Sequence, residues 1–295
     1  MKLSVKLLNN LLLKRKCKYM TVTAKQVQDL RKMSGAGMMD CKAALAENNA
    51  DIDLAFQWLR EKGIAKAQKK STRDANEGLV SIMSNETGTV MVEINSETDF
   101  VSRNKDFHAL VKKITKIILD AEDNAESFKD EVSSIINDAI GVIGENIVFK
   151  RSNFIKGQTY SYIHNSLGDN LGKIGVLLDL KSDPAIDLTN IGKNICMHIA
   201  ATSPKSLDEN SLNTDIIETE KNIIKEQLKD SGKPDDVVEK MLDGKMKKFF
   251  EEVVLLNQKY VIDPSMTISQ LLVKAGNNGV SKVSVNSFLR YELGQ

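Results

Sequence analysis

The side chains best suited to metal or nucleophilic chemistry are few and far apart in the sequence. No two of them have the HxxxH or CxxC spacing that brings a pair of ligands to one zinc ion. Widely spaced cysteines are also more typical of a reducing compartment than of a disulfide framework. The sequence therefore predicts no metal site. The residues concerned are His108, His164, His198, Cys17, Cys41 and Cys196.

Glycine-rich signatures of nucleotide and hydrolase chemistry are missing as well. The sequence contains no GxxxxGK[ST], GxGxxG or GxSxG motif. Gly168 and Gly172, which flank Asp169-Asn170-Leu171, fit a hairpin turn better than a phosphate-binding loop. Because no nucleophile is paired with a base, we predict a binding protein that is not an enzyme, with no catalytic residue and no cofactor of its own.

A different kind of site is indicated where a strand meets a helix, at Thr98-Asp99-Phe100-Val101. Residues 90–95 fit a strand in which Val90, Val92 and Ile94 share one face, and residues 104–120 carry an apolar helical face. Two interpretations remain open. The segment is either an ordinary turn in which Phe100 packs back as an apolar staple, or a rigid corner that exposes Phe100 as a wedge with Asp99 as its polar partner.

The charge distribution argues against nucleic acid as the main ligand. The chain has 41 basic and 40 acidic residues, but residues 1–20 contain bases and no acid, so the remainder is mildly acidic. No apolar run reaches the length that spans a bilayer. The basic, leucine-rich residues 1–20 fit either an extension upstream of a start at Met20 or an organellar presequence. We accordingly expect a cytoplasmic protein, or a mitochondrial one if the segment is a presequence.

Residues 21–63 predict three short helices that form a small docking bundle. Thr23 begins a capping box, Gly35 ends the first helix, Asp51 begins the third helix, and Gly63 ends it before a polar linker. Three helices in about forty residues enclose little core of their own. This favours a role in docking rather than an independent activity.

Apolar side chains at the start of the second helix offer a surface to a partner. Met38 is predicted to be exposed for docking, because a flexible methionine adapts to a partner surface, whereas Met39 is predicted to lie in the core. Arg31 either contacts an acidic group of a partner or is solvated. Trp58 fits the core better than a site.

The rest of the chain predicts an α+β core with an internal duplication. Two hairpins, each followed by a helix and a later strand, give two small antiparallel sheets with helices on one face. Apolar stripes on both sides of Ser231-Gly232-Lys233-Pro234 predict an inserted antiparallel helical hairpin, with Gly232 at C′ and Pro234 at N1. The predicted divisions are 1–20 (leader or start-site extension), 21–63 (bundle), 64–77 (linker), 78–157 (first core subdomain), 158–210 with 257–295 (second core subdomain) and 211–256 (helical hairpin).

Four motifs in sequence order resemble the translation elongation factor Ts family. Residues 31–45 are similar to R-x-x-[ST]-G-A-G-x-x-[DE]-C-K-x-A-L, and residues 93–101 are similar to a strand followed by a TDFV loop. Residues 197–204 resemble a third family motif, and residues 231–249 resemble the helical hairpin of bacterial members. One such motif is weak evidence, but four in order, covering nearly everything after the leader, are specific.

The resemblance implies a ubiquitin-associated-like bundle, a duplicated α+β core and a helical protrusion. It also implies guanine-nucleotide exchange on elongation factor Tu, whose GDP and magnesium the protein acts on without a cofactor of its own. Contact with nucleic acid or membrane is not implied, and a dimer of heterodimers is one option. The implied site residues, which displace magnesium from the partner, are Thr98, Asp99, Phe100 and Val101, with Arg31, Met38 and His198 as secondary partner contacts.

Two other functions stay open on the residues alone. A small bundle with a Gly-Met-Met loop also fits a ubiquitin-binding adaptor, although the TDFV segment and the helical hairpin are then unexplained. The basic leader and linker fit an RNA-binding accessory of translation, but the acidic remainder of the chain counts against it. His198, taken without the resemblance, fits an ordinary structural histidine better than a contact residue.

Overall fold

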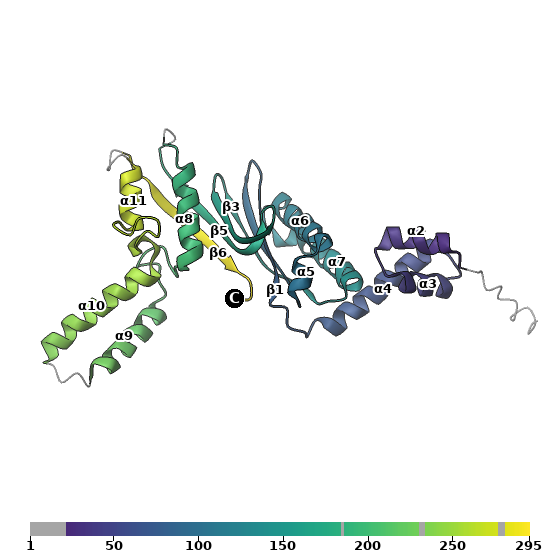
Figure 1. Cartoon of the computed structure of the whole chain (residues 1–295), viewed down its shortest axis with the longest axis horizontal. Coiled ribbons are helices and arrows are strands. Elements are labelled where there is room, and N and C mark those ends of the chain that lie inside the picture. Colours follow the sequence, from purple (N-terminus) through teal and green to yellow (C-terminus); the bar gives the residue numbers. More distant parts are fainter. Residues whose placement is uncertain (1–21, 184–185, 230–233, 277–280) are drawn as a thin grey trace, which may run out of the picture. The chain divides into compact units, whose positions relative to one another are not determined.

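The structure is a computed structural model that describes residues 22–183, 186–229, 234–276 and 281–295. These residues form two compact units (Figure 1). Of the described residues, unit 1 contains those up to Asp74 together with Glu131–Ile147, and unit 2 contains those within Ala75–Asp130 and Val148–Gln295. One division falls inside the helix α7 (Ala125–Ile143), so the chain passes between the units three times.

The helical bundle of unit 1 begins and ends its helices largely where the sequence predicts. Thr23 and Gln26 form the capping box, Gly35 ends the first helix with a φ of 67°, and the Asp51 side chain caps the third. Trp58 packs, half-buried, against the bundle core. The helices are α2 (Ala24–Ser34), α3 (Met38–Glu47) and α4 (Ile52–Lys70). The buried core side chains are Val27, Leu30, Ala36, Cys41, Ala44, Leu45 and Ala55.

The prediction that the third helix ends at Gly63 is wrong, because α4 continues to Lys70. Gly63 is buried against α7, where a Cβ built on Gly141 meets the Gly63 Cα at 3.2 Å. The glycine thus serves a close approach of two helices rather than a helix end. Arg60 reinforces this crossing, since its Nε lies 3.6 Å from Asp138 Oδ1. Residues 64–70, predicted to be linker, therefore belong to α4.

Unit 2 is built on one six-stranded sheet with the order β3-β2-β1-β5-β4, in which β6 also pairs with β5. In each half of the sheet, the first two strands form a hairpin and the third pairs with the second. The halves join where β1 pairs with β5, at Val80↔Gly172 and Ser81↔Leu171. The predicted two separate sheets are therefore one, although the strand order repeats. The strands are β1 (Glu77–Ser84), β2 (Gly88–Ser96), β3 (Ile147–Lys156), β4 (Tyr160–Gly168), β5 (Leu171–Lys181) and β6 (Ser284–Glu292).

Helices occupy the connection before the last strand of each half. The connection from β2 to β3 contains α5 (Asp99–Ser102), α6 (Lys105–Asp120) and α7. The connection from β5 to β6 contains α8 (Thr189–Thr202), α9 (Thr214–Lys229), α10 (Asp235–Val253), the 3-10 turn η1 (Leu255–Asn257) and α11 (Ile268–Ala275). The predicted apolar face of α6 packs on β1 and β2, where Phe107, Val111 and Ile114 are buried.

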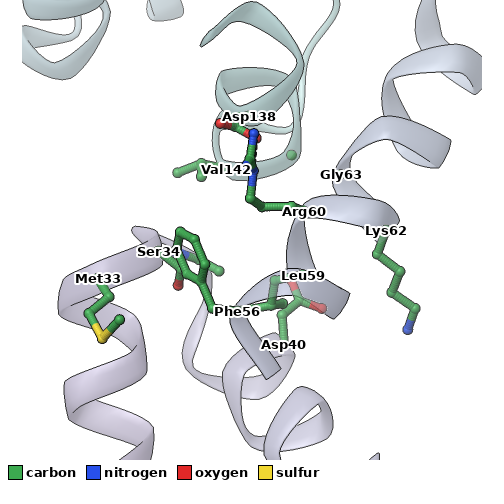
Figure 2. A pocket seen from close by; sticks show the side chains of 12 residues that line it. Met33, Ser34, Asp40, Phe56, Leu59, Arg60, Lys62, Gly63, Asp138 and Val142 are labelled. Atoms are coloured by element: carbon green, nitrogen blue, oxygen red, sulfur yellow. Dashed lines mark hydrogen bonds and ion pairs between the residues drawn. The ribbon is translucent and has the colours of Figure 1, made fainter. Parts of the chain in front are cut away.

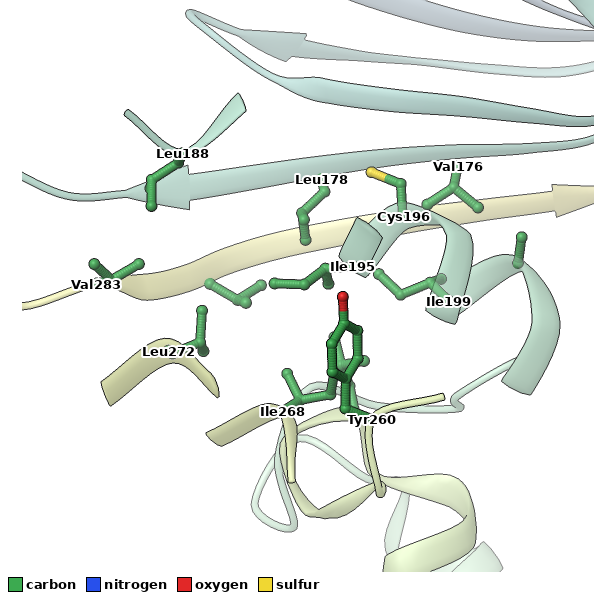
Figure 3. Packing of buried hydrophobic residues seen from close by; sticks show 13 residues of the cluster. Val176, Leu178, Leu188, Ile195, Cys196, Ile199, Tyr260, Ile268, Leu272 and Val283 are labelled. Atoms are coloured by element: carbon green, nitrogen blue, oxygen red, sulfur yellow. The ribbon is translucent and has the colours of Figure 1, made fainter. Parts of the chain in front are cut away.

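The second half of the sheet has its own core against α8 (Figure 3). Ile195 and Ile199 of α8 meet Val176 and Leu178 of β5, and Tyr260 closes the cluster from the loop before α11. This cluster buries each of these side chains almost completely. It fixes α8 and the segment around Tyr260 to the sheet.

The predicted helical hairpin is present as α9 and α10, which pack against each other (Figure 1). Its core consists of Ile224, Leu228 and Met246. Ile223 of α9, although apolar, is 46% exposed. Pro234 occupies the N-cap of α10 rather than N1, and Gly232 lies outside the described residues. The hairpin therefore packs most of its apolar side chains between its own two helices.

Candidate partner-binding site

The strand β2, which leads into the Thr98–Val101 corner, is buried along its whole length. Its two alternating sets of side chains are both buried, because both faces of the strand are covered. Val92 lies on the face that α6 covers, and Met91 belongs to a cluster on the other face with Val80 and Tyr291. A strand held on both faces is a rigid support for the residues that follow it.

A buried charge on β2 contributes to this support. Glu93 is fully buried, and Arg151 Nε donates to its Oε2 at 2.7 Å while Asn95 Nδ2 donates to its Oε1 at 3.2 Å. The Arg151 guanidinium also lies 4.2 Å from the ring centre of Tyr291 and donates to the Glu292 carbonyl oxygen at 3.3 Å. Burial raises the pKa of Tyr291 to about 12. One arginine thus connects β2, β3 and β6.

The corner itself is fixed by short-range hydrogen bonds. Ser96 Oγ donates to the Thr98 carbonyl oxygen at 3.1 Å, and Thr98 is the N-cap residue of α5 in extended conformation. Within α5, Ser102 Oγ donates to the Asp99 carbonyl oxygen at 2.8 Å, and Arg103 Nε lies 3.4 Å from Asp99 Oδ2. The Asp99 side chain therefore forms an ion pair with Arg103 along the exposed side of its own short helix.

Phe100 points away from all of this support. Its side chain is 81% exposed, while the next residue, Val101, is only 8% exposed and anchors the turn in unit 2. The interpretation of Phe100 as a staple packed on its own helix is therefore wrong. The corner presents an aromatic ring to the surroundings on a backbone that is fixed before and after it.

The bundle of unit 1 also exposes large apolar side chains. Met38 is 60% exposed, as predicted, but Met39 is 76% exposed, so its predicted place in the core is wrong. Gly37 caps α3, and the methionines that follow occupy its first turn, where only Cys41 turns inward. Arg31 is exposed near the end of α2.

A small cavity in unit 1 lies between the bundle and α7 (Figure 2). Its volume is about 150 Å³, and the Arg60–Asp138 ion pair lies at its edge. Pockets for nucleotide-sized ligands measure roughly 300–1,000 Å³. The cavity is thus too small for such a ligand. Its apolar lining includes Met33, Phe56, Leu59 and Val142.

The structure places His198 in the interior, contrary to a role as a surface contact. Its ring is fully buried; Nε2 lies 2.8 Å from Gln258 Oε1, and the Val261 N–H donates to Nδ1 at 3.3 Å. Because Nδ1 accepts, Nε2 carries the proton and donates to Gln258. Burial also lowers the pKa of His198. The residue links α8 to the segment before α11, as the interpretation as a structural histidine predicts, and its side chain is not exposed to a partner in this structure.

Other side-chain chemistry is sparse in the part of the chain that the structure describes. Among those residues, no group of three His, Cys, Asp or Glu side chains is arranged to hold a metal ion. Cys196 is buried in the core between α8 and β5, and this burial raises the pKa of its thiol to about 12. None of the described helices is long and apolar enough to cross a bilayer.

Sequence reasoning did not find the residues that hold the corner. Ser96, Ser102 and Arg103 are unremarkable polar residues by type. The i,i+4 spacing of Asp99 and Arg103 is a signal that could have indicated their ion pair. An exposed aromatic ring on fixed backbone, together with exposed methionines on a small bundle, defines the class: a protein that binds another protein.

Comparison with known proteins agrees with the motifs. A family profile described as Elongation factor TS matches residues 97–295. Proteins named Elongation factor Ts from Paracoccus denitrificans, Bartonella tribocorum and Sinorhizobium fredii are 48%, 46% and 45% identical to the chain. Each alignment covers 94% of this chain and 93%, 94% and 94% of the respective relative. The chain therefore belongs to the elongation factor Ts family.

Proposed function

We propose that the chain is a guanine-nucleotide exchange factor for elongation factor Tu in translation elongation. Membership of the elongation factor Ts family supports this activity. The observation that points to a particular residue is the exposure of Phe100, whose side chain is 81% exposed on a fixed corner. A pre-organised aromatic side chain binds a partner without paying much ordering entropy.

The proposed action is allosteric and breaks no covalent bond. Phe100 enters the partner as a wedge near its magnesium ion, with Thr98 and Asp99 at the base of the wedge and Val101 as its anchor. Displacement of magnesium leaves the charge of GDP poorly neutralised, so GDP dissociates faster. The coupling is reciprocal: GDP lowers the affinity of the factor by the same ratio as the factor lowers the affinity of GDP. Incoming GTP then completes the cycle.

Unit 1 supplies the second contact in this proposal. We assign docking to the bundle, with a ubiquitin-associated-like fold, through Met38 and Arg31, both of which are exposed. Met39, which is more exposed than Met38, joins this surface. Methionine suits the role because its flexible, polarizable side chain adapts to the shape of a partner.

The proposed setting is bacterial-type translation in the cytoplasm, or in mitochondria if residues 1–20 are a presequence. Neither nucleic acid nor membrane is a proposed ligand. The factor acts on the GDP and magnesium that its partner holds, either in a one-to-one complex or as a dimer of heterodimers.

The test is a nucleotide-release experiment. Elongation factor Tu loaded with fluorescent GDP is chased with excess unlabelled GDP in the presence of catalytic amounts of the chain, Phe100→Ala, or Ile262→Ala. Ile262 is a matched control, because it is also a large apolar side chain of unit 2 and is 54% exposed. We expect rapid release with the parent and with Ile262→Ala and much slower release with Phe100→Ala. No acceleration by the parent overturns the proposed exchange function. Equal acceleration by all three proteins shows instead that Phe100 is not the wedge.

A further inference from the structure

The short helix that carries Phe100 is hydrogen-bonded to a ring side chain of the helix that follows it. His108, in the first turn of α6, places its Nε2 at 2.8 Å from the carbonyl oxygen of Ser102, the last residue of α5. A carbonyl oxygen only accepts, so Nε2 carries a proton and donates. This bond occupies a carbonyl at the C-terminal end of α5, where a four-residue helix has no intrahelical donor left.

The other edge of the ring lies against the turn between β4 and β5. A Cβ built on Gly168 would meet His108 Nδ1 at 3.3 Å, so the imidazole is next to the backbone of the turn. One helical turn further along α6, Lys112 Nζ lies 3.7 Å from Asp169 Oδ2. The turn is itself fixed to the sheet, since the Ile82 N–H donates to the Asn170 carbonyl oxygen at 3.1 Å.

We propose that His108 is a positioning residue that holds α5, and with it Phe100, in register with the β4–β5 turn of the second half of the sheet. A one-turn helix is not stable alone, because nucleation costs more than its few hydrogen bonds return. The orientation of α5 therefore depends on contacts outside the helix, and the hydrogen bond from His108 of α6 is one such contact at its C-terminal end. The effect of His108 on nucleotide release rests on the proposed function, whereas its effect on the stability of α5 is independent of that function.

The first arm of the test uses the free chain and measures amide hydrogen exchange. The reporters are the N–H groups of Arg103 and Asn104, which donate to Asp99 and Val101 at the end of α5. Loss of one neutral hydrogen bond corresponds to roughly 5-fold faster local exchange. We expect this in His108→Ala, with β2 amides unchanged as the control for global folding. His108→Gln, whose amide can donate to the same carbonyl, restores slow exchange.

A second perturbation approaches the ring from the opposite side. Gly168→Ala keeps the imidazole but displaces it by a few tenths of an ångström, so exchange at the same two amides increases by a smaller factor. If His108→Ala destabilises the whole of unit 2, this milder variant still decides the question. Unchanged exchange at Arg103 and Asn104 in Gly168→Ala and in folded His108→Ala overturns the proposal.

The second arm measures GDP release from elongation factor Tu as the factor concentration is varied. Because Phe100 acts in the complex while other surfaces supply binding, His108→Ala lowers the maximal release rate roughly 5-fold and leaves the half-saturating concentration unchanged. His108→Gln restores the maximal rate. A parent chain that does not accelerate release refutes the exchange function but not the positioning of α5. A normal maximal rate in His108→Ala, with accelerated amide exchange, refutes the link between His108 and the wedge.

Discussion

Removal of the arginine beside the buried carboxylate of β2 tests what makes the corner rigid. Glu93 is fully buried, and Arg151 Nε is its charged partner at 2.7 Å. Replacing Arg151 by Met keeps much of the side-chain volume but leaves Glu93 without that cation. Loss of one partner of a buried pair costs about 3–5 kcal/mol. Because the Arg151 side chain is 33% exposed, water can partly solvate the site, and we expect about 3 kcal/mol.

The assay must follow unit 2 rather than unit 1. The single tryptophan, Trp58, lies in unit 1, so its fluorescence does not report on β2. Calorimetry, together with hydrogen exchange at β2 amides, follows the relevant unit. For a unit of roughly 200 residues, each kcal/mol shifts Tm by about 2–4 °C, so Arg151→Met lowers the Tm of unit 2 by about 6–12 °C.

Two further variants make this expectation refutable. Arg103→Met removes an exposed ion pair with Asp99 and should change stability by less than about 1 kcal/mol. Glu93→Gln removes the buried charge, so Arg151→Met should cost clearly less in that background. A cost below about 1 kcal/mol for Arg151→Met, or an equal cost with and without the Glu93 charge, contradicts the reasoning.

Two other predictions concern the second half of the sheet. Burial lowers the pKa of His198 from its usual 6.5. As the pH drops below about 6.5 the unfolded chain therefore binds a proton at His198 more readily than the folded chain, and stability falls. Urea midpoints measured from pH 7.5 to 5 should show this pH dependence, and His198→Gln should reduce it. Gly192→Ala should destabilise by about 1–3 kcal/mol despite better helix propensity, because its Cβ would lie 2.2 Å from Tyr160 Cγ. Gly244→Ala in α10, whose added Cβ would meet nothing within 4 Å apart from its own stretch of helix, should instead be neutral or stabilising by up to about 1 kcal/mol. Thermal unfolding of the two variants distinguishes the cases.

Local signals predicted the local structure well. The capping box at Thr23 and the glycine end at Gly35 depend on a few neighbouring residues, and both are present. Gly63 failed as a helix end because its role is set by α7, a helix about 80 residues further along the chain. The single sheet was missed for the same reason, since the pairing of β1 with β5 involves only Val80 and Ser81 and leaves no pattern in the sequence.

The exposure of the side chains at the candidate site could be predicted only in part from the sequence. Phe100 fitted both a staple and a wedge, because periodicity gives the position of a side chain on its element but not the neighbours that cover it. Met39 was placed in the core but is exposed, whereas the interpretation of His198 as a structural histidine agrees with its burial. Likewise Glu93 reads as the polar face of an alternating strand until Arg151, 58 residues away, covers it.

The exposure of Phe100 sets a scale for its proposed action. Burying a phenylalanine side chain contributes about 1.5–3 kcal/mol. The free chain does not gain most of this free energy, because the Phe100 ring is 81% exposed. If the ring is buried only in the exchange complex, that free energy is available to oppose GDP, which corresponds to roughly 10- to 150-fold in affinity at 1.4 kcal/mol per factor of ten. Phe100→Ala should therefore cost one to two orders of magnitude in the acceleration of release. Any acceleration beyond that range must come from other contacts, which makes the exposed methionines of the bundle the next side chains to truncate.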